Sequence, residues 1–182
     1  VNGVTGHGNN SVRNNLNMDW VRPVNAEYIT ADGKMVINQE AEFGIIGGWS
    51  RLFAPSSFRL KAKNIYEGMK SFDYKFFESK PYNKYKEILI RNGGNDNDSQ
   101  AHGRIKDAII QQTLSTSGIY VDCQALQPAH IFFNGKYIGM LNLRDPSNKY
   151  FGTANYGYDK DNMDAYEYAG GYIQKAGDNK AF

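Results

Sequence analysis

The chain has 182 residues, a length that suits one domain with a buried core. Its 21 basic and 19 acidic residues include no basic run, so the sequence gives no nucleic-acid signature. No window approaches about twenty apolar residues, so no transmembrane segment is expected in this chain. The lone Cys123 excludes an internal disulfide framework and a thiolate metal site.

Short strands separated by turns are predicted for the first half of the chain. The Asn- and Gly-rich residues 1–19 lack periodicity and are expected to form a loop or an extended arm. A hairpin should follow, with strands over residues 24–30 and 35–38 around the turn Ala31-Asp32-Gly33-Lys34. Apolar or alternating runs predict further strands over residues 42–46, 58–62 and 85–90.

Helices and one hairpin are predicted for the second half. Apolar residues at helical spacing favour a helix over residues 103–114, which Ser117-Gly118 would end. Asn134-Gly135, between alternating apolar runs, predicts a hairpin from Pro128 to Arg144. Pro146 suits the first turn of a short helix that reaches about Ala154. These elements favour an α+β fold, in which a strand-rich half joins a small helical part.

Two glycine-rich turns follow predicted strands and are candidate anion sites. In the turn of residues 47–51, Gly47 and Gly48 would let backbone amides approach a phosphate, although a tight turn explains the same residues. After the strand over 85–90, Arg91 can clamp a phosphate or carboxylate, and Asn92 and Asp96 offer oxygen ligands to a cation. A turn held by side-chain hydrogen bonds of Asn and Asp is the alternative there.

Acids, amides and cations gather after the predicted hairpin. Such a group can hold Mg²⁺ and nucleotide phosphates. The stretch Asp159-Lys160-Asp161-Asn162 favours a solvated turn, and Asp164 follows it. The three histidines have no metal-like spacing, and no Gly-x-Ser-x-Gly elbow occurs, so zinc and serine-hydrolase chemistry are not supported.

The ordered set of short motifs resembles the CotH-type domain, the spore coat protein H kinase family. The matching pieces, in chain order, are Trp20-Val21-Arg22-Pro23-Val24-Asn25-Ala26-Glu27-Tyr28, Asp32-Gly33, Gly47-Gly48-Trp49-Ser50-Arg51, Ser57-Phe58-Arg59-Leu60, Phe72-x-Tyr74-x-Phe76-Phe77, Arg91-Asn92-Gly93-Gly94-Asn95-Asp96, Asp122-x-Gln124-x-x-x-Pro128, Phe133-Asn134-Gly135-x-Tyr137-x-Gly139 and Asn162-Met163-Asp164. The resemblance implies that residues 20–182 form a strand-rich, atypical kinase-like domain. It also implies that the C-terminal part of the catalytic lobe is missing.

The resemblance also implies a function and a set of site residues. Members of this family bind ATP and Mg²⁺ and phosphorylate protein substrates outside the cytoplasm. The residues that would carry these roles here are Gly47, Gly48, Arg51, Lys61, Lys63 and Arg91 for the nucleotide, Asp145 as the catalytic carboxylate, and Asn148 and Asp164 for the metal.

Two positions depart from the family pattern. Ser56 stands where the family often carries a lysine, and Asn148 stands where an acid is common. An amide can coordinate a metal but cannot act as a base, which favours a divergent member, a pseudokinase.

We therefore expect an extracytoplasmic protein, secreted or surface-anchored as a lipoprotein, with a protein substrate or surface partner. Its site would derive from an ATP–Mg²⁺ kinase pocket. The alternative hypothesis is a non-catalytic surface module that binds a glycan or a protein.

Overall fold

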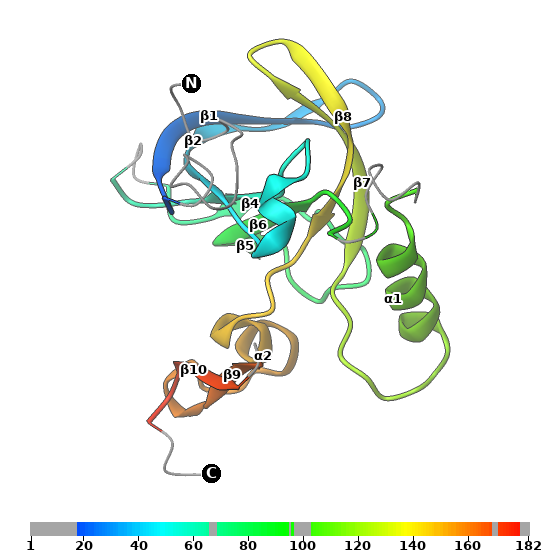
Figure 1. Ribbon diagram of the computed structural model, residues 1–182. Helices are drawn as coiled ribbons and strands as arrows, with labels where there is room; N and C mark the ends of the chain where they lie inside the picture. Colours follow the sequence, from blue (N-terminus) through cyan, green and yellow to red (C-terminus); the bar gives the residue numbers. More distant parts are fainter. Residues whose placement is uncertain (1–17, 66–68, 95, 97–102, 169–170, 179–182) are drawn as a thin grey trace.

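A curled, six-stranded antiparallel sheet forms the body of the molecule, in a computed structural model that describes residues 18–65, 69–94, 96, 103–168 and 171–178 (Figure 1). The expected arm therefore lies outside the described residues except at its last two positions. The strand order is β1-β2-β3-β6-β8-β7, which leaves β1 and β7 as the outer strands. The strands are β1 (Val21–Ile29), β2 (Met35–Ile45), β3 (Phe58–Lys61), β6 (Glu87–Arg91), β7 (Leu126–Phe133) and β8 (Lys136–Arg144).

Smaller elements surround the sheet. Helix α1 (Lys106–Thr116) lies beside β7, while α2 (Lys149–Tyr156) and a separate hairpin follow the end of β8 (Figure 1). The two small hairpins are β4 (Phe72–Asp73) with β5 (Lys84–Tyr85), and β9 (Ala165–Tyr168) with β10 (Tyr172–Ala176). Two short 3-10 helices are η2 (Trp49–Leu52) and η4 (Lys160–Asn162). The chain is thus strand-rich α+β, as the sequence predicts, and its sheet forms a curled half-barrel accompanied by two helices.

The hairpin around Asn134-Gly135 confirms the prediction for that segment. Both residues have positive φ, 48° for Asn134 and 76° for Gly135, as a two-residue turn between twisted strands requires. One strand prediction was wrong: residues 35–38 and 42–46 belong to a single strand, β2. Its partner β1 is long enough to pair along its whole length, from Ile29 opposite Met35 to Val21 opposite Gly44.

The two faces of the sheet differ in chemistry. One face supplies a buried apolar row across four strands, formed by Ile45, Phe58, Ile90 and Leu143. The aromatic rings of Phe72, Phe76, Phe77 and Tyr85 belong to the same core cluster. The other face carries a charged row, Glu42, Lys61 and Glu87, in direct cross-strand register. The alternation of side chains along a strand therefore separates a core face from a polar face.

Helix boundaries follow from capping contacts. Helix α1 begins three residues later than predicted, and the backbone N–H of its first residue, Lys106, donates to Asp96 Oδ2 at 2.6 Å. Gly118, with φ of 77°, follows its last turn. Helix α2 begins after Asn148, whose side chain accepts from the Tyr150 N–H at 2.9 Å. No helix in the described part of the chain is long and apolar enough to cross a membrane.

Candidate functional site: a lysine-rich cleft beside the polar face

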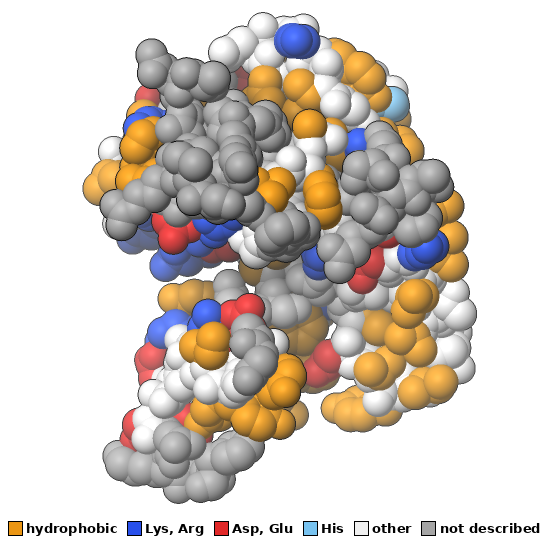
Figure 2. All heavy atoms as spheres, viewed as in Figure 1, with side chains coloured by type: hydrophobic (Ala, Val, Ile, Leu, Met, Phe, Trp, Pro, Cys, Tyr) orange, Lys and Arg blue, Asp and Glu red, His pale blue; other side chains and the backbone are white. Residues whose placement is uncertain are grey.

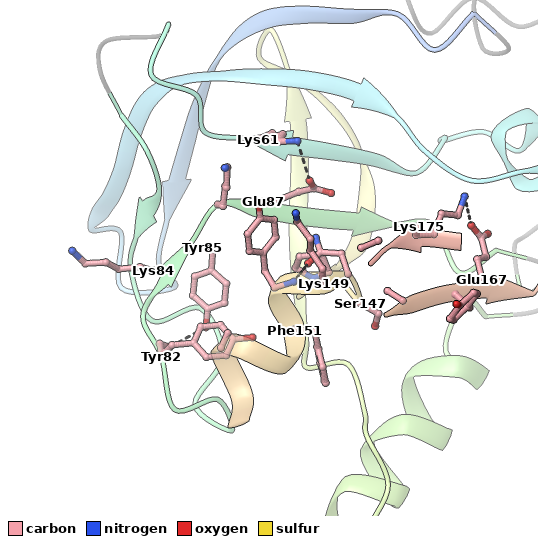
Figure 3. Close-up of a pocket in the computed structure, with 18 residues that line it drawn as sticks. Lys61, Tyr82, Lys84, Tyr85, Glu87, Ser147, Lys149, Phe151, Glu167 and Lys175 are labelled. Atoms are coloured by element: carbon pink, nitrogen blue, oxygen red, sulfur yellow. Dashed lines mark hydrogen bonds and ion pairs between the residues drawn. The ribbon is translucent and has the colours of Figure 1, made fainter. Parts of the chain in front are cut away.

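A cleft of about 670 Å³ separates the sheet from α2 and the β9–β10 hairpin. Figure 2 shows this hollow between the two parts, with Lys and Arg side chains along both of its edges. The sheet contributes Lys61 from the end of β3 and Glu87 from the start of β6. Segments far apart in sequence close the other sides, namely residues 82–86, 146–151 and 165–167 together with Lys175 (Figure 3).

Lysines outnumber acids on the walls of this cleft. The lysines are Lys61, Lys84, Lys86, Lys149 and Lys175, and the acids are Glu87 and Glu167. Three of the lysines have carboxylate partners: Lys61 lies 4.0 Å from Glu87, Lys175 lies 2.7 Å from Glu167, and Lys84 lies 3.3 Å from Asp73. Lys86 and Lys149 instead lie over the ring of Tyr150, at 5.4 and 5.5 Å from its centroid. The cleft is therefore electropositive.

Aromatic side chains form much of the remaining wall. Tyr82 and Tyr85 come from the segment before β6, with ring centroids 4.9 Å apart, and Tyr150 and Phe151 come from the first turn of α2. Ligand sites combine such apolar walls with a few placed polar groups. The combination of rings and ammonium groups suits a ligand with a flat, apolar part and an anionic part.

Asp145 lies directly beneath the cleft at the end of β8 and is fully buried. Its Oδ1 accepts the Ala125 N–H at 2.5 Å, and its Oδ2 lies 3.0 Å from Lys80 Nζ and 3.1 Å from the Tyr82 hydroxyl. Lys80 is itself 8% exposed and also donates to Asn155 Oδ1 at 3.1 Å. This ion pair ties the loop before β5 to β8 and α2.

Two tyrosine hydroxyls of the cleft wall, those of Tyr82 and Tyr85, have raised pKa values. Burial raises the pKa of Tyr82 above its ordinary value, and the charge of the adjacent Asp145 raises it further. Burial and Asp145 also raise the pKa of Tyr85. Both side chains are therefore neutral hydrogen-bonding groups at physiological pH rather than general bases.

A second buried charge lies next to Asp145. Arg144 is 1% exposed, and its Nη2 lies 2.6 Å from Asp107 Oδ2 on α1. Burial lowers the pKa of Arg144, while Asp107 opposes that change. Within the described residues, its Nε and Nη1 atoms have no hydrogen-bond partner. The end of β8 thus links α1 to the floor of the cleft.

The structure brings two of the sequence-predicted site residues, Lys61 and Asn148, to the cleft. Asn148 uses its side-chain oxygen to cap α2. Asp145 supports the cleft from beneath without lining it. Asp164 comes directly before β9 and packs against Gly177, where an added Cβ would collide with its carboxylate. The catalytic and metal roles of these residues remain predictions.

The other predicted nucleotide contacts lie away from the cleft walls. Arg51 pairs with Asp19 at 2.7 Å and donates to the carbonyl of Gly47, which together with Gly48 precedes η2. Lys63 pairs with the buried Glu42. Arg91 lies on the polar face at the end of β6, where its charge acts on Arg144.

Asn92 ties the turn that begins at Arg91 to the segment between η2 and β3. It is 1% exposed, and its Nδ2 donates to the Pro55 carbonyl at 2.9 Å. Its Oδ1 accepts from the Ser57 hydroxyl at 2.8 Å and from the Gly94 N–H at 2.9 Å. These bonds match the turn-forming alternative for the segment that begins at Arg91.

No cluster of acidic or imidazole side chains marks a metal site in the described part of the chain. The described residues contain no group of three or more His, Cys, Asp and Glu side chains arranged to hold a metal ion. Mg²⁺ prefers several oxygen ligands, usually including one or two carboxylates. The side-chain oxygen of Asn148 caps α2 and Asp164 packs against Gly177, so their metal roles stay predictions.

Several residues of the cleft have no clear signal in the sequence. Lys80 and Lys86 stand among ordinary polar residues, and only the fold brings them to Asp145 and Tyr150. Lys149 belongs to the polar group after the hairpin, but its position over the same ring as Lys86 depends on where α2 begins.

A strand-rich α+β domain with an electropositive, aromatic-walled cleft is the class of protein that these observations define. The CotH kinase protein family model matches residues 44–181, which is part of a typical CotH domain. Because this match covers well over half of the sequence, the chain belongs to the CotH kinase protein family. The Trp20–Tyr28 and Asp32-Gly33 pieces of the resemblance lie before the matched region. Neither the curated proteins nor the solved structures provide a match.

Proposed function

We propose that this CotH-family domain binds a nucleoside triphosphate in the cleft between the sheet and α2. The carrying observation is the electropositive wall set between tyrosine and phenylalanine rings, in a volume of about 670 Å³. Pockets for small ligands commonly have roughly 300–1,000 Å³. The rings would pack against the base, and the lysines would face the phosphates. ATP is the expected ligand because of the family.

We further propose that the chain by itself does not transfer the phosphate. Phosphoryl transfer requires a carboxylate that reaches the substrate hydroxyl. Asp145 is 0% exposed and has partners on both carboxylate oxygens, among them Lys80. The neighbouring Asn148 is an amide and cannot take its place as a base. A nucleotide-binding pseudokinase accounts for both the electropositive cleft and the buried carboxylate.

Thermal unfolding with and without ATP tests nucleotide binding. In millimolar ATP with Mg²⁺ present, a ligand at about 100 times its Kd adds about 2.7 kcal/mol of stability. For a domain of this size that is a rise in Tm of roughly 5–10 °C. Absence of any shift with ATP, with or without Mg²⁺, would sink the proposal.

A blocking substitution gives the matched control. Ala154 lies on the cleft wall in α2, so Ala154→Trp should fill the cleft and remove the shift while leaving every charge in place. Ala31 is exposed in the β1–β2 turn, and Ala31→Trp should retain the shift. Equal shifts in both variants would place the nucleotide elsewhere.

A second candidate function is a non-catalytic surface module. Tyr168 and Tyr172 are 71% and 77% exposed, and their ring centroids lie 5.4 Å apart across the β9–β10 hairpin. Exposed rings of this kind are able to stack on a sugar or on a protein partner. Glycan-array binding that Tyr172→Ser abolishes, together with no response to ATP, would favour this function.

We also propose an extracytoplasmic location, secreted or surface-anchored, with a protein as substrate or partner. The family supports this proposal. Recovery of the native protein only from the cytoplasmic fraction of its source cells would reject it.

A further inference from the structure

Lys86 and Lys149 form a pair of cations on one aromatic ring. Lys86 is the residue directly before β6, and Lys149 is the first residue of α2. Their ammonium groups lie 5.4 and 5.5 Å from the centroid of the Tyr150 ring. Figure 3 shows Lys149 between the sheet and α2, inside the group of side chains that line the cleft. Two segments remote in sequence thus place like charges around one point.

This pair differs from the other lysines of the cleft in having no carboxylate within ion-pair distance among the described residues. Asp161 feels the charge of Lys149, but its own carboxylate is paired with Lys160. Cation–π contacts with Tyr150 hold the ammonium groups in position but do not neutralise their charge. Positive charge is therefore concentrated here.

The start of α2 adds to the positive potential. The first turn contains no acidic residue, and Lys149 occupies its first position. A cation at the N-terminus of a helix is unfavourable, because the helix dipole already gives that end a partial positive charge. An anion bound by both lysines would relieve this repulsion.

We propose that Lys86 and Lys149 bind the phosphate chain of the ligand directly, without a divalent cation. This inference rests on the proposed nucleotide site and names its anion-binding groups. Phosphate oxygens accept charge-assisted hydrogen bonds from ammonium groups, and lysine acts as a point charge toward phosphate. The two acids of the cleft walls, Glu87 and Glu167, pair with Lys61 and Lys175, and the described residues contain no group of three or more His, Cys, Asp and Glu side chains that could hold Mg²⁺. The lysine pair supplies positive charge in its place.

Isothermal titration calorimetry in EDTA tests the metal-free mode on the full chain. ATP and inorganic tripolyphosphate are each titrated, and adenosine serves as the ligand without phosphates. ATP should bind in EDTA about as tightly as with Mg²⁺, and adenosine should bind at least about tenfold more weakly, a difference of about 1.4 kcal/mol. Binding of ATP only when Mg²⁺ is added would overturn this inference while leaving the proposed function intact.

Charge-removing variants test the assignment to these two residues. Lys86→Gln and Lys149→Gln should each lower the affinity for ATP, measured in EDTA, by about tenfold or more. Lys84 lines the same cleft but pairs with Asp73, so Lys84→Gln is the matched control and should change the affinity by less than about threefold. Equal effects of all three variants would overturn the assignment. Unchanged Tm values of the free variants exclude unfolding as the cause.

The titration arms also identify the source of the phosphate chain. If tripolyphosphate binds as tightly as ATP, the site recognises the anion itself, and an inorganic polyphosphate is as good a ligand as a nucleotide. If ATP binds more tightly by about tenfold or more, the aromatic wall contributes and the nucleotide is the ligand. Both results support the lysine pair. No binding of either ligand in any buffer would overturn both the inference and the proposed function.

Discussion

At the scale of single residues, Lys80 and Asp145 form an ion pair in which both charges are buried. The two side chains are 8% and 0% exposed and lie 3.0 Å apart. Removing one partner of a buried pair leaves an uncompensated charge, which costs about 3–5 kcal/mol. The residue that the family resemblance assigns to catalysis therefore has a structural task in this chain.

Urea unfolding of Asp145→Asn measures that task. The free energy of unfolding should fall by about 3–5 kcal/mol, and combining Lys80→Met with Asp145→Leu should recover much of it. Asp73→Asn, which breaks the exposed pair with Lys84, should cost less than about 1 kcal/mol. An unchanged urea midpoint in Asp145→Asn would instead leave the carboxylate available for catalysis.

The Tyr82 hydroxyl makes stability depend on pH on the alkaline side. Its pKa is raised in the folded protein, mainly by burial and then by Asp145, so folding favours the neutral form. The contribution is complete below the unfolded pKa of about 10 and is lost as pH rises above it. Tyr82→Phe should flatten the decline in unfolding free energy between about pH 10 and 11. An equally steep decline in the variant would assign it to other groups.

The residue pattern predicted on which face of a strand a charged side chain lies, but not the residue with which it pairs. Alternation along β3 places Arg59 and Lys61 on one face, and Arg59 and Lys63, two residues beyond β3, both approach Glu42. The sequence gives no indication that Lys80 contacts Asp145, because 65 positions separate them and only the closed fold brings them together. Long-range ion pairs of this kind have no local periodicity to reveal them.

At the scale of elements, the turns between strands are joined by one amide. The Asn92 side chain bridges the segment of Pro55 and Ser57 to the turn containing Gly94. It takes part in three hydrogen bonds at or below 2.9 Å and is buried, so its removal leaves several buried polar groups without hydrogen-bond partners.

Asn92→Ala should lower the free energy of unfolding by roughly 2–4 kcal/mol, because buried donors and acceptors lose their partners. Asn25→Ala removes an exposed hydrogen bond to Asn38 and should cost less than about 1 kcal/mol. Chemical denaturation of both variants provides the comparison. Equal, small losses would mean that the turns hold without the bridge.

Elements with a local signal were predictable, and those set by tertiary contacts were not. The Asn134-Gly135 hairpin needs only its own turn residues. The start of α1 depends on Asp96, ten positions earlier than the amide that it caps, and the prediction placed that start too early. The continuous strand β2 was predicted as two pieces, since its middle residues are polar and only pairing with β1 keeps them extended.

At the scale of the whole molecule, the apolar core lies on one side of the cleft and shares Tyr85 with its wall. Within the described residues, the core cluster and the side chains packed on it lie between Trp20 and Leu143. Helix α2 and the β9–β10 hairpin contribute none of them and meet the sheet across the cleft. Few buried apolar contacts are the mark of a segment that opens locally.

Hydrogen exchange should therefore separate the two parts. Amides of β2, β3 and β8 should exchange slowly, and those of β9 and β10 should exchange at least about tenfold faster, because they open without breaking the core. Tripolyphosphate should slow exchange at the start of α2 with little change in β2. Mass spectrometry on peptides from each segment checks both statements. Uniform exchange would indicate a single cooperative unit.

The candidate site was only partly predictable at this scale. Asn148 and Lys61 were identified from motifs, and both lie on the cleft. Lys86, Tyr150 and Lys175 were not, because the cleft is assembled from five separate stretches of chain that only the fold brings together. The order of the motifs indicated the family, whereas the residues of the cleft walls could be identified only from the three-dimensional structure.

The open sheet has two outer strands, and each carries a proline: Pro23 in β1 and Pro128 in β7. A proline ring has no N–H to offer to an incoming strand, and sheets tolerate it mainly at their borders. A second copy that tried to extend the sheet at either border would meet an interrupted ladder. The two proline rings therefore disfavour edge-to-edge aggregation of this open half-barrel.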